Sequence, residues 1–132
     1  MFSLESRLFS ADHIYMLNPQ ILAELRSLGD DDPKFFKGLL QAFLQSVAGR
    51  LPTIKEAIAL KSGEKLALAA HALKSSCLNL GAQKLGELCE ELEKTGISGT
   101  TEGTDQLWAE LTTEAAVVKR EIEDLPEMKK DV

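Results

Sequence analysis

Three residues whose types could carry out chemistry together lie close to one another in this sequence. His71 is followed after three and four residues by Lys74 and Ser75. On a helix these spacings bring all three side chains onto one patch of surface. An imidazole is a nucleophile, an ammonium neutralises negative charge and a hydroxyl donates a hydrogen bond, which together suit a bound phosphoryl group. A lone surface histidine is more often without function, so the spacing alone leaves both interpretations open.

A helix over about residues 64–80 positions these side chains. Its apolar residues recur at spacings of three and four, as on a helix with one buried face. His71 points almost opposite to that face, so we expect it to be exposed on a rigid element. Its neighbours suit the docking of a partner protein, although the apolar ones among them would also fit a wider buried face. The expected core residues are Leu66, Ala69, Leu73, Cys77 and Leu80, and the expected docking residues are Glu64, Ala67, Leu68 and Leu78.

The same periodicity predicts helices along the whole chain and no sheet. We expect helices over about 18–28, 33–58, 64–80, 82–94 and 105–123, a loop over 95–104 and a frayed tail over 126–132. Pro52 lies inside the second of these, where a bend is expected because proline removes one helical hydrogen bond. The predicted fold is all-α, an antiparallel four-helix bundle with a short extra N-terminal helix. Residues 1–132 form a single domain in this interpretation, with a core over about 18–123 and frayed termini.

Composition and charge exclude several classes of function. The 132 residues carry a formal net charge of −6, which argues against nucleic acid as a partner because that requires a basic face. No apolar run approaches the length of a membrane span, and no signal peptide is recognisable. The two cysteines suggest no disulfide framework. We therefore expect a cytoplasmic protein, and a monomer.

Metal and cofactor chemistry is not expected. His13, His71, Cys77 and Cys89 lack the spacing of a zinc site, and both cysteines fall on predicted core faces. The sequence has no glycine-rich nucleotide loop, so the chain is not expected to be an autonomous kinase. A bundle that binds a metal or a small molecule is disfavoured because inward-facing His and Asp/Glu pairs are scarce.

The string from Ala70 to Ala82, AHALKSSCLNLGA, resembles the pattern of histidine-containing phosphotransfer (HPt) domains, and the similarity continues to Glu93 through Leu85, Leu88, Cys89 and Leu92. The resemblance implies that His71 is phosphorylated and that Lys74 helps to neutralise the phosphoryl oxygens. It also implies that Glu93 accepts a hydrogen bond from one ring nitrogen, which leaves Nε2 free as the nucleophile. Ser75 departs from the family, which usually has glycine there.

The resemblance further implies a relay between His71 and the aspartate of a response-regulator receiver domain, fed by a sensor histidine kinase system. The receiver domain would supply the aspartate and Mg²⁺, and this chain would act as a phosphocarrier without a cofactor of its own. The competing hypothesis is a degenerate helical module that binds a receiver or kinase domain without transferring phosphate.

Overall fold

The computed structural model describes residues 16–129, which contain six helices and no strand. Helical residues make up 82% of this part, so the all-α prediction is confirmed. No helix in the described part of the chain combines the length and apolar character needed to cross a bilayer. The helices are α2 (Pro19–Leu28), α3 (Pro33–Ala59), α4 (Gly63–Leu80), α5 (Gln83–Ile97), α6 (Thr104–Glu123) and α7 (Pro126–Lys129).

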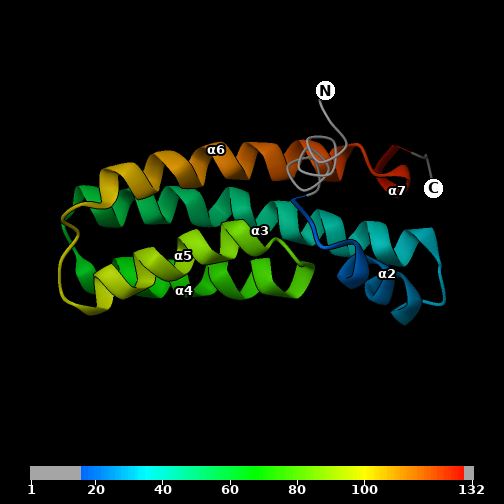
Figure 1. Ribbon diagram of the computed structural model, residues 1–132, viewed down its shortest axis with the longest axis horizontal. Coiled ribbons are helices and arrows are strands. Elements are labelled where there is room, and N and C mark those ends of the chain that lie inside the picture. The colour runs from blue at the N-terminus through cyan, green and yellow to red at the C-terminus, as the bar shows by residue number, and fades with distance from the viewer. Residues whose placement is uncertain (1–15, 130–132) are drawn as a thin grey trace, which may run out of the picture.

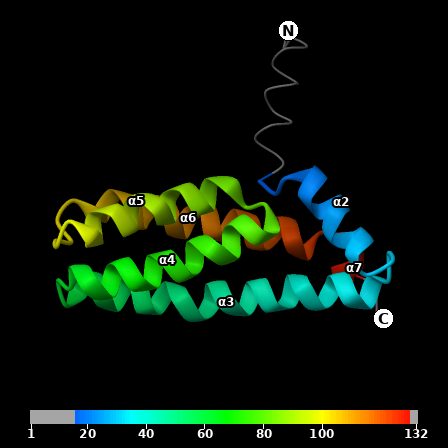
Figure 2. The same cartoon turned by 90° about the horizontal axis from the view of Figure 1, so that it is seen from below.

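Four long helices run up and down beside one another (Figure 1). Helices α3, α4, α5 and α6 alternate in direction, and α4 and α5 pack most extensively. Figure 2 shows α2 set at one end of the bundle beside the start of α3. The predicted antiparallel four-helix bundle with a short extra N-terminal helix is therefore confirmed.

Local sequence fixes where several of these helices begin and end. The side chains of Asn18, Asp32 and Ser62 accept hydrogen bonds from backbone N–H groups in the first turns of α2, α3 and α4. Such caps satisfy donors that have no partner inside the helix. Gly81 ends α4 in the left-handed conformation, with φ of 86°, which glycine adopts without steric cost. The chain therefore reverses at once into α5, and α4 and α5 form a tight hairpin.

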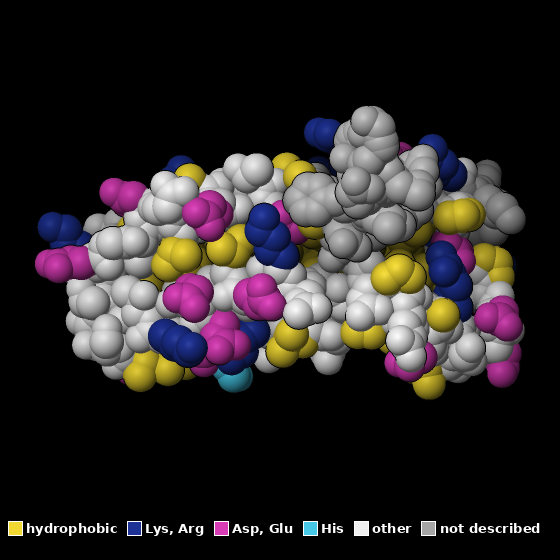
Figure 3. Space-filling view, in the orientation of Figure 1, with side chains coloured by type: hydrophobic (Ala, Val, Ile, Leu, Met, Phe, Trp, Pro, Cys, Tyr) yellow, Lys and Arg dark blue, Asp and Glu magenta, His cyan; other side chains and the backbone are white. Residues whose placement is uncertain are grey.

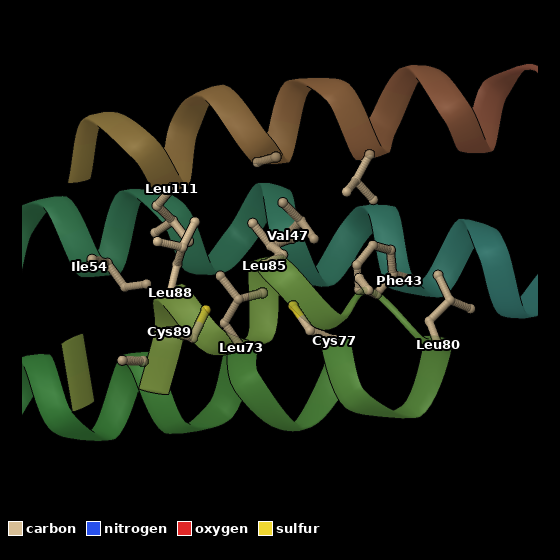
Figure 4. Close-up of a cluster of buried hydrophobic side chains, with 14 of the residues drawn as sticks. Phe43, Val47, Ile54, Leu73, Cys77, Leu80, Leu85, Leu88, Cys89 and Leu111 are labelled. Carbon is tan, nitrogen blue, oxygen red and sulfur yellow. The ribbon is translucent and has the colours of Figure 1, made fainter. Parts of the chain in front are cut away.

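One apolar core runs along the inside of the bundle. Figure 4 shows side chains from α3, α4, α5 and α6 meeting between the helices. All five core residues predicted on α4 are buried, and they face buried residues of α5 such as Leu85, Cys89 and Leu92. Because one face of α4 is fully buried, its opposite face is held at a fixed orientation toward solvent.

Tertiary packing extends helix α5 beyond the sequence prediction and keeps α3 continuous, as predicted. Helix α5 continues to Ile97, whereas the predicted helix ends near residue 94. Helix α3 runs without interruption through Pro52 as a single 27-residue helix. Its apolar residues on both sides of Pro52, including Val47 and Ile54, are buried in the same core, so packing outweighs the loss of one backbone hydrogen bond.

The prediction of a frayed C-terminal tail is wrong for its first four residues. These residues form α7, which packs against α3, and Met128 lies against the core. The guanidinium of Arg26 donates to both carboxylate oxygens of Glu127, at 2.7 and 3.1 Å. A bidentate pair of this kind has a defined geometry that a single contact lacks. Residues 1–15 and 130–132, the other predicted frayed ends, lie outside the described residues.

Two glycines bring the backbones of α4 and α5 into direct contact far from the hairpin turn. A Cβ atom on Gly96 would lie 2.5 Å from the carbonyl oxygen of Gly63 and 2.6 Å from the backbone nitrogen of Ala67. A Cβ atom on Gly63 would lie 2.8 Å from the carbonyl oxygen of Gly96. These neighbours are backbone atoms and cannot move aside alone. The spacing of α4 and α5 therefore depends on both residues being glycine.

We expect Gly96→Ala to lower the free energy of unfolding by about 3 kcal/mol, the upper part of the range for an overpacked interior. Gly38→Ala is the matched control, because a Cβ atom at this exposed position on α3 meets nothing within 4 Å. That substitution should stabilise the protein by up to about 1 kcal/mol through helix propensity. Chemical denaturation of the two variants measures both effects, and shifts of the same sign would contradict this account of the α4–α5 contact.

Glu114 on α6 is a buried carboxylate with an incomplete set of partners. Its side chain is 6% exposed, and its Oε1 lies 4.0 Å from Nζ of Lys84. Its Oε2 has no hydrogen-bond partner in the described structure. Burial raises the pKa of Glu114, against the opposing effect of the Lys84 charge. A buried acceptor left without a donor costs free energy, so Glu114 destabilises the bundle once it is ionised.

We expect Glu114→Gln to raise the free energy of unfolding by about 1 kcal/mol at neutral pH. Because the pKa of Glu114 is raised in the folded state, its protonated form stabilises the wild type at low pH. That contribution is lost as pH rises through the folded-state pKa. The advantage of the glutamine variant should therefore grow from about pH 4 to about pH 7. Denaturation at both values tests this, with Glu110→Gln on the exposed side of α6 as the control; a pH-independent gain would contradict it.

Candidate functional site

His71 lies in the middle of α4 with its side chain 60% exposed, as the sequence predicts. Three of the four residues within two positions of it, Ala69, Ala70 and Leu73, are buried and anchor the helix. In Figure 3 the histidine, in cyan, projects from the edge of the molecule beside acidic and basic side chains. The imidazole is therefore presented to solvent from a rigid element.

Glu93 on α5 binds the imidazole ring of His71. Its Oε2 lies 2.8 Å from Nδ1 of His71, and its side chain is only 15% exposed. An ionised carboxylate can only accept a hydrogen bond, so Nδ1 must carry the proton and donate it. In the neutral ring this leaves the lone pair on Nε2, which makes no hydrogen bond with any residue between 16 and 129. The site thus holds one tautomer with its nucleophilic nitrogen facing outward.

Lys74 is the third residue of the site and binds the same carboxylate of Glu93. Its Nζ lies 2.7 Å from Oε1 of Glu93, so one carboxylate holds both the imidazole and the ammonium. The hydrogen bond from Lys74, with a further one from His71, lowers the pKa of Glu93 against the opposing effect of burial. The hydrogen bond to Glu93 raises the pKa of Lys74. Glu93 is therefore an anion, and Lys74 a cation, at neutral pH.

Ser75 lies beside the ring without bonding to it. Its Oγ donates to the backbone carbonyl of His71 at 3.2 Å, a common bond for serine inside a helix. This hydroxyl could bond either a phosphoryl group or the backbone of its own helix. In the described structure it bonds the backbone of its own helix.

The predicted docking residues surround His71 along α4. Leu68 and Leu78 are 68% and 54% exposed. Glu64 is exposed and Ala67 is half-buried, next to Gly96 of α5. The two leucines therefore do not widen the buried face, and they flank the histidine with accessible apolar surface.

The two cysteines pack inside the bundle. Cys77 and Cys89 are free and buried, and a hydrogen bond between them, together with burial, raises the pKa of Cys77. They behave as small apolar residues between α4 and α5, as predicted. Within residues 16–129, no three His, Cys, Asp or Glu side chains are grouped so that they could hold a metal ion.

The contact between Lys74 and Glu93 was not predicted from the sequence. The hairpin offers a signal that would have suggested it: His71 lies ten residues before Gly81, and Glu93 lies eleven after Ala82. Residues at similar distances from a tight turn face each other across an antiparallel pair of helices. Lys74, one turn along α4 from His71, is therefore within reach of the same carboxylate.

Fold and site together define an all-helical bundle that presents one histidine outward, backed by a carboxylate and a lysine. Comparison with known protein families agrees, because residues 38–127 match the Hpt domain. This match covers more than half of the chain, which therefore belongs to the Hpt domain family.

Two known proteins resemble the chain. The phosphorelay intermediate protein YPD1 of Candida albicans is 29% identical over 76 residues, which are 58% of this chain and 41% of that protein. The chain thus spans less than half the length of this relative. The crystal structure of histidine-containing phosphotransfer protein B from Pseudomonas aeruginosa PAO1 superposes with a TM-score of 0.79 at 24% identity. That match covers 88% of this chain and 97% of the other, and it supports the fold.

Proposed function

We propose that this protein is a phosphocarrier in a two-component phosphorelay and that His71 carries the phosphoryl group. The observation that supports this most directly is the 2.8 Å contact between Nδ1 of His71 and Glu93, because it leaves Nε2 as an exposed nucleophile on a rigid helix. Membership of the Hpt domain family supports the same function.

The transfer step needs little from this chain beyond a positioned nucleophile. Nε2 attacks the phosphorus of an aspartyl phosphate, the N–P bond forms, and the aspartate carboxylate leaves with the electrons of the P–O bond. Lys74 lies one helical turn from the ring, where its charge offsets that of the phosphoryl oxygens. Mg²⁺ is expected on the partner, and the proposal assigns no cofactor to this chain.

The proposed partner is the receiver domain of a response regulator, within a sensor histidine kinase system. It docks over α4, where Leu68 and Leu78 supply accessible apolar surface on both sides of His71, with Ala67 and Glu64 at the edge. The chain transfers phosphoryl groups and does not make them from ATP. We further propose that it acts in the cytoplasm and as a monomer.

Incubation with phosphorylated receiver domains, followed by tracing of the labelled phosphoryl group, tests this function. Label should appear on this chain in an acid-labile form and should return to an unphosphorylated receiver domain. Binding without any transfer would instead identify a helical interaction module.

A further inference from the structure

We propose that the negative charge of Glu93, and not its hydrogen bond alone, keeps Nδ1 of His71 protonated while Nε2 carries the phosphoryl group. This inference rests on the proposed function and names the residue that maintains the reactivity of the phosphorylated ring. Glu93 is a positioning residue in this scheme, because it acts through His71 and does not touch the reacting phosphorus.

The charge balance of the reaction shows why this proton matters. When Nε2 forms the N–P bond, its lone pair is used and the ring becomes a cation that still holds hydrogen on Nδ1. In the return step the N–P bond breaks, its electrons go back to Nε2, and a neutral imidazole departs. If Nδ1 had lost its proton first, the departing group would be an imidazolate anion, which leaves far more slowly. The phosphoryl group would then be stranded on the histidine.

Glu93 is well placed to prevent this loss. Its Oε2 lies 2.8 Å from Nδ1, and an opposite charge at that distance favours the protonated ring. The Glu93 side chain is 15% exposed and that of His71 is 60% exposed, so water screens the interaction only in part. A glutamine there could still accept the hydrogen bond from Nδ1, but it would lack the charge.

The neighbouring charged groups preserve the ionisation of Glu93. Lys74 on α4 binds Oε1 at 2.7 Å and lowers the pKa of Glu93. On α5, Glu90 acts on Lys74 and reinforces its positive charge, and the buried Cys89 adds a smaller effect of the same sign. Glu93 therefore stays ionised from weakly acidic to weakly alkaline pH. Over this range, a phosphorylated imidazole without a carboxylate partner would lose its Nδ1 proton.

The test compares the wild type with Glu93→Gln, both in a His13→Gln background so that His71 is the single histidine. Phosphoramidate, a small-molecule phosphoryl donor, is used to phosphorylate the full chain in place of a receiver domain. Nitrogen NMR of the labelled ring then follows loss of the Nδ1 proton as pH is raised. We expect this loss to occur at least one pH unit lower in Glu93→Gln, which corresponds to a tenfold weaker hold on the proton. Glu90→Gln, which removes a nearby charge from α5, is the control and should shift it much less.

Single-turnover transfer to a receiver domain provides the second measurement. The ratio of the Glu93→Gln rate to the wild-type rate should approach one at low pH, fall by up to tenfold per pH unit between the points where the variant and the wild type lose the proton, and then level off. The inference would be overturned if the two proteins lost the Nδ1 proton at the same pH, or if the rate ratio did not change with pH. If Glu93→Gln lost the Nδ1 proton at lower pH but neither protein transferred its phosphoryl group to a receiver domain, the role of Glu93 would be supported and the proposed function refuted.

Discussion

His71→Gln is expected to abolish phosphoryl acceptance while leaving the bundle folded. Glutamine has no ring nitrogen that can attack phosphorus, so no residual transfer through this position is expected. Because the imidazole is 60% exposed, its removal takes away one surface contact, and the free energy of unfolding should change by no more than about 1 kcal/mol. Label from a phosphorylated receiver domain and thermal unfolding measure the two effects.

His13 is the natural control for this result, because it is the only other histidine in the chain. It lies outside the described residues. His13→Gln should accept label at the wild-type rate. If His71→Gln still became labelled, or if His13→Gln lost labelling, the assignment of the phosphorylated residue would be wrong.

Lys74→Ala is expected to slow transfer by roughly 10²-fold, the scale on which removal of one group that stabilises developing charge acts in enzymes. Its effect on folding should be small, because an ion pair close to solvent contributes little to stability. Docking should weaken much less than transfer, since the proposed docking surface consists mainly of apolar side chains. Initial transfer rates and the affinity for an unphosphorylated receiver domain separate these quantities.

Lys65→Ala is the matched comparison, because it removes the same charge from an exposed position on α4. That variant should transfer at close to the wild-type rate. Equal losses of docking and transfer in Lys74→Ala would indicate that the lysine binds the partner and does not serve the phosphoryl group.

The sequence predicted most of what positions the histidine. The apolar residues of α4 recur on a single face of the helix. Leu66, Leu73 and Cys77 were therefore predicted to be buried, as they are, and His71 was predicted to point outward. Gly81 marks the end of this helix because few other residues adopt its left-handed conformation. The approach of Glu93 to His71 was expected from the family resemblance, and the contact is present at 2.8 Å.

Features that depend on residues distant in sequence were missed. The end of α5 was placed too early because residues 95–104 are rich in Gly, Ser and Thr, a composition typical of a loop, whereas the lack of a side chain on Gly96 allows contact with Gly63. The tail was expected to fray because its pairing with Arg26, 101 residues away from Glu127, leaves no local pattern. The burial of Glu114 was missed for a similar reason, since a single charged residue on an amphipathic helix is normally assigned to the exposed side.

Helix α7 packs against α3 at the end of the bundle that carries α2, whereas α4, the helix of His71, begins at the other end (Figure 1). The 27 residues of α3 span about 40 Å, and His71 lies about 12 Å along α4 from the far end. A receiver domain fused after α7 must therefore reach across about 30 Å. A flexible Gly/Ser tether of about 30 residues has a root-mean-square length close to that span. Tethers of fewer than about nine residues could not span this distance even when fully extended, and tethers near 30 residues would give the joined domain the highest effective concentration at the histidine.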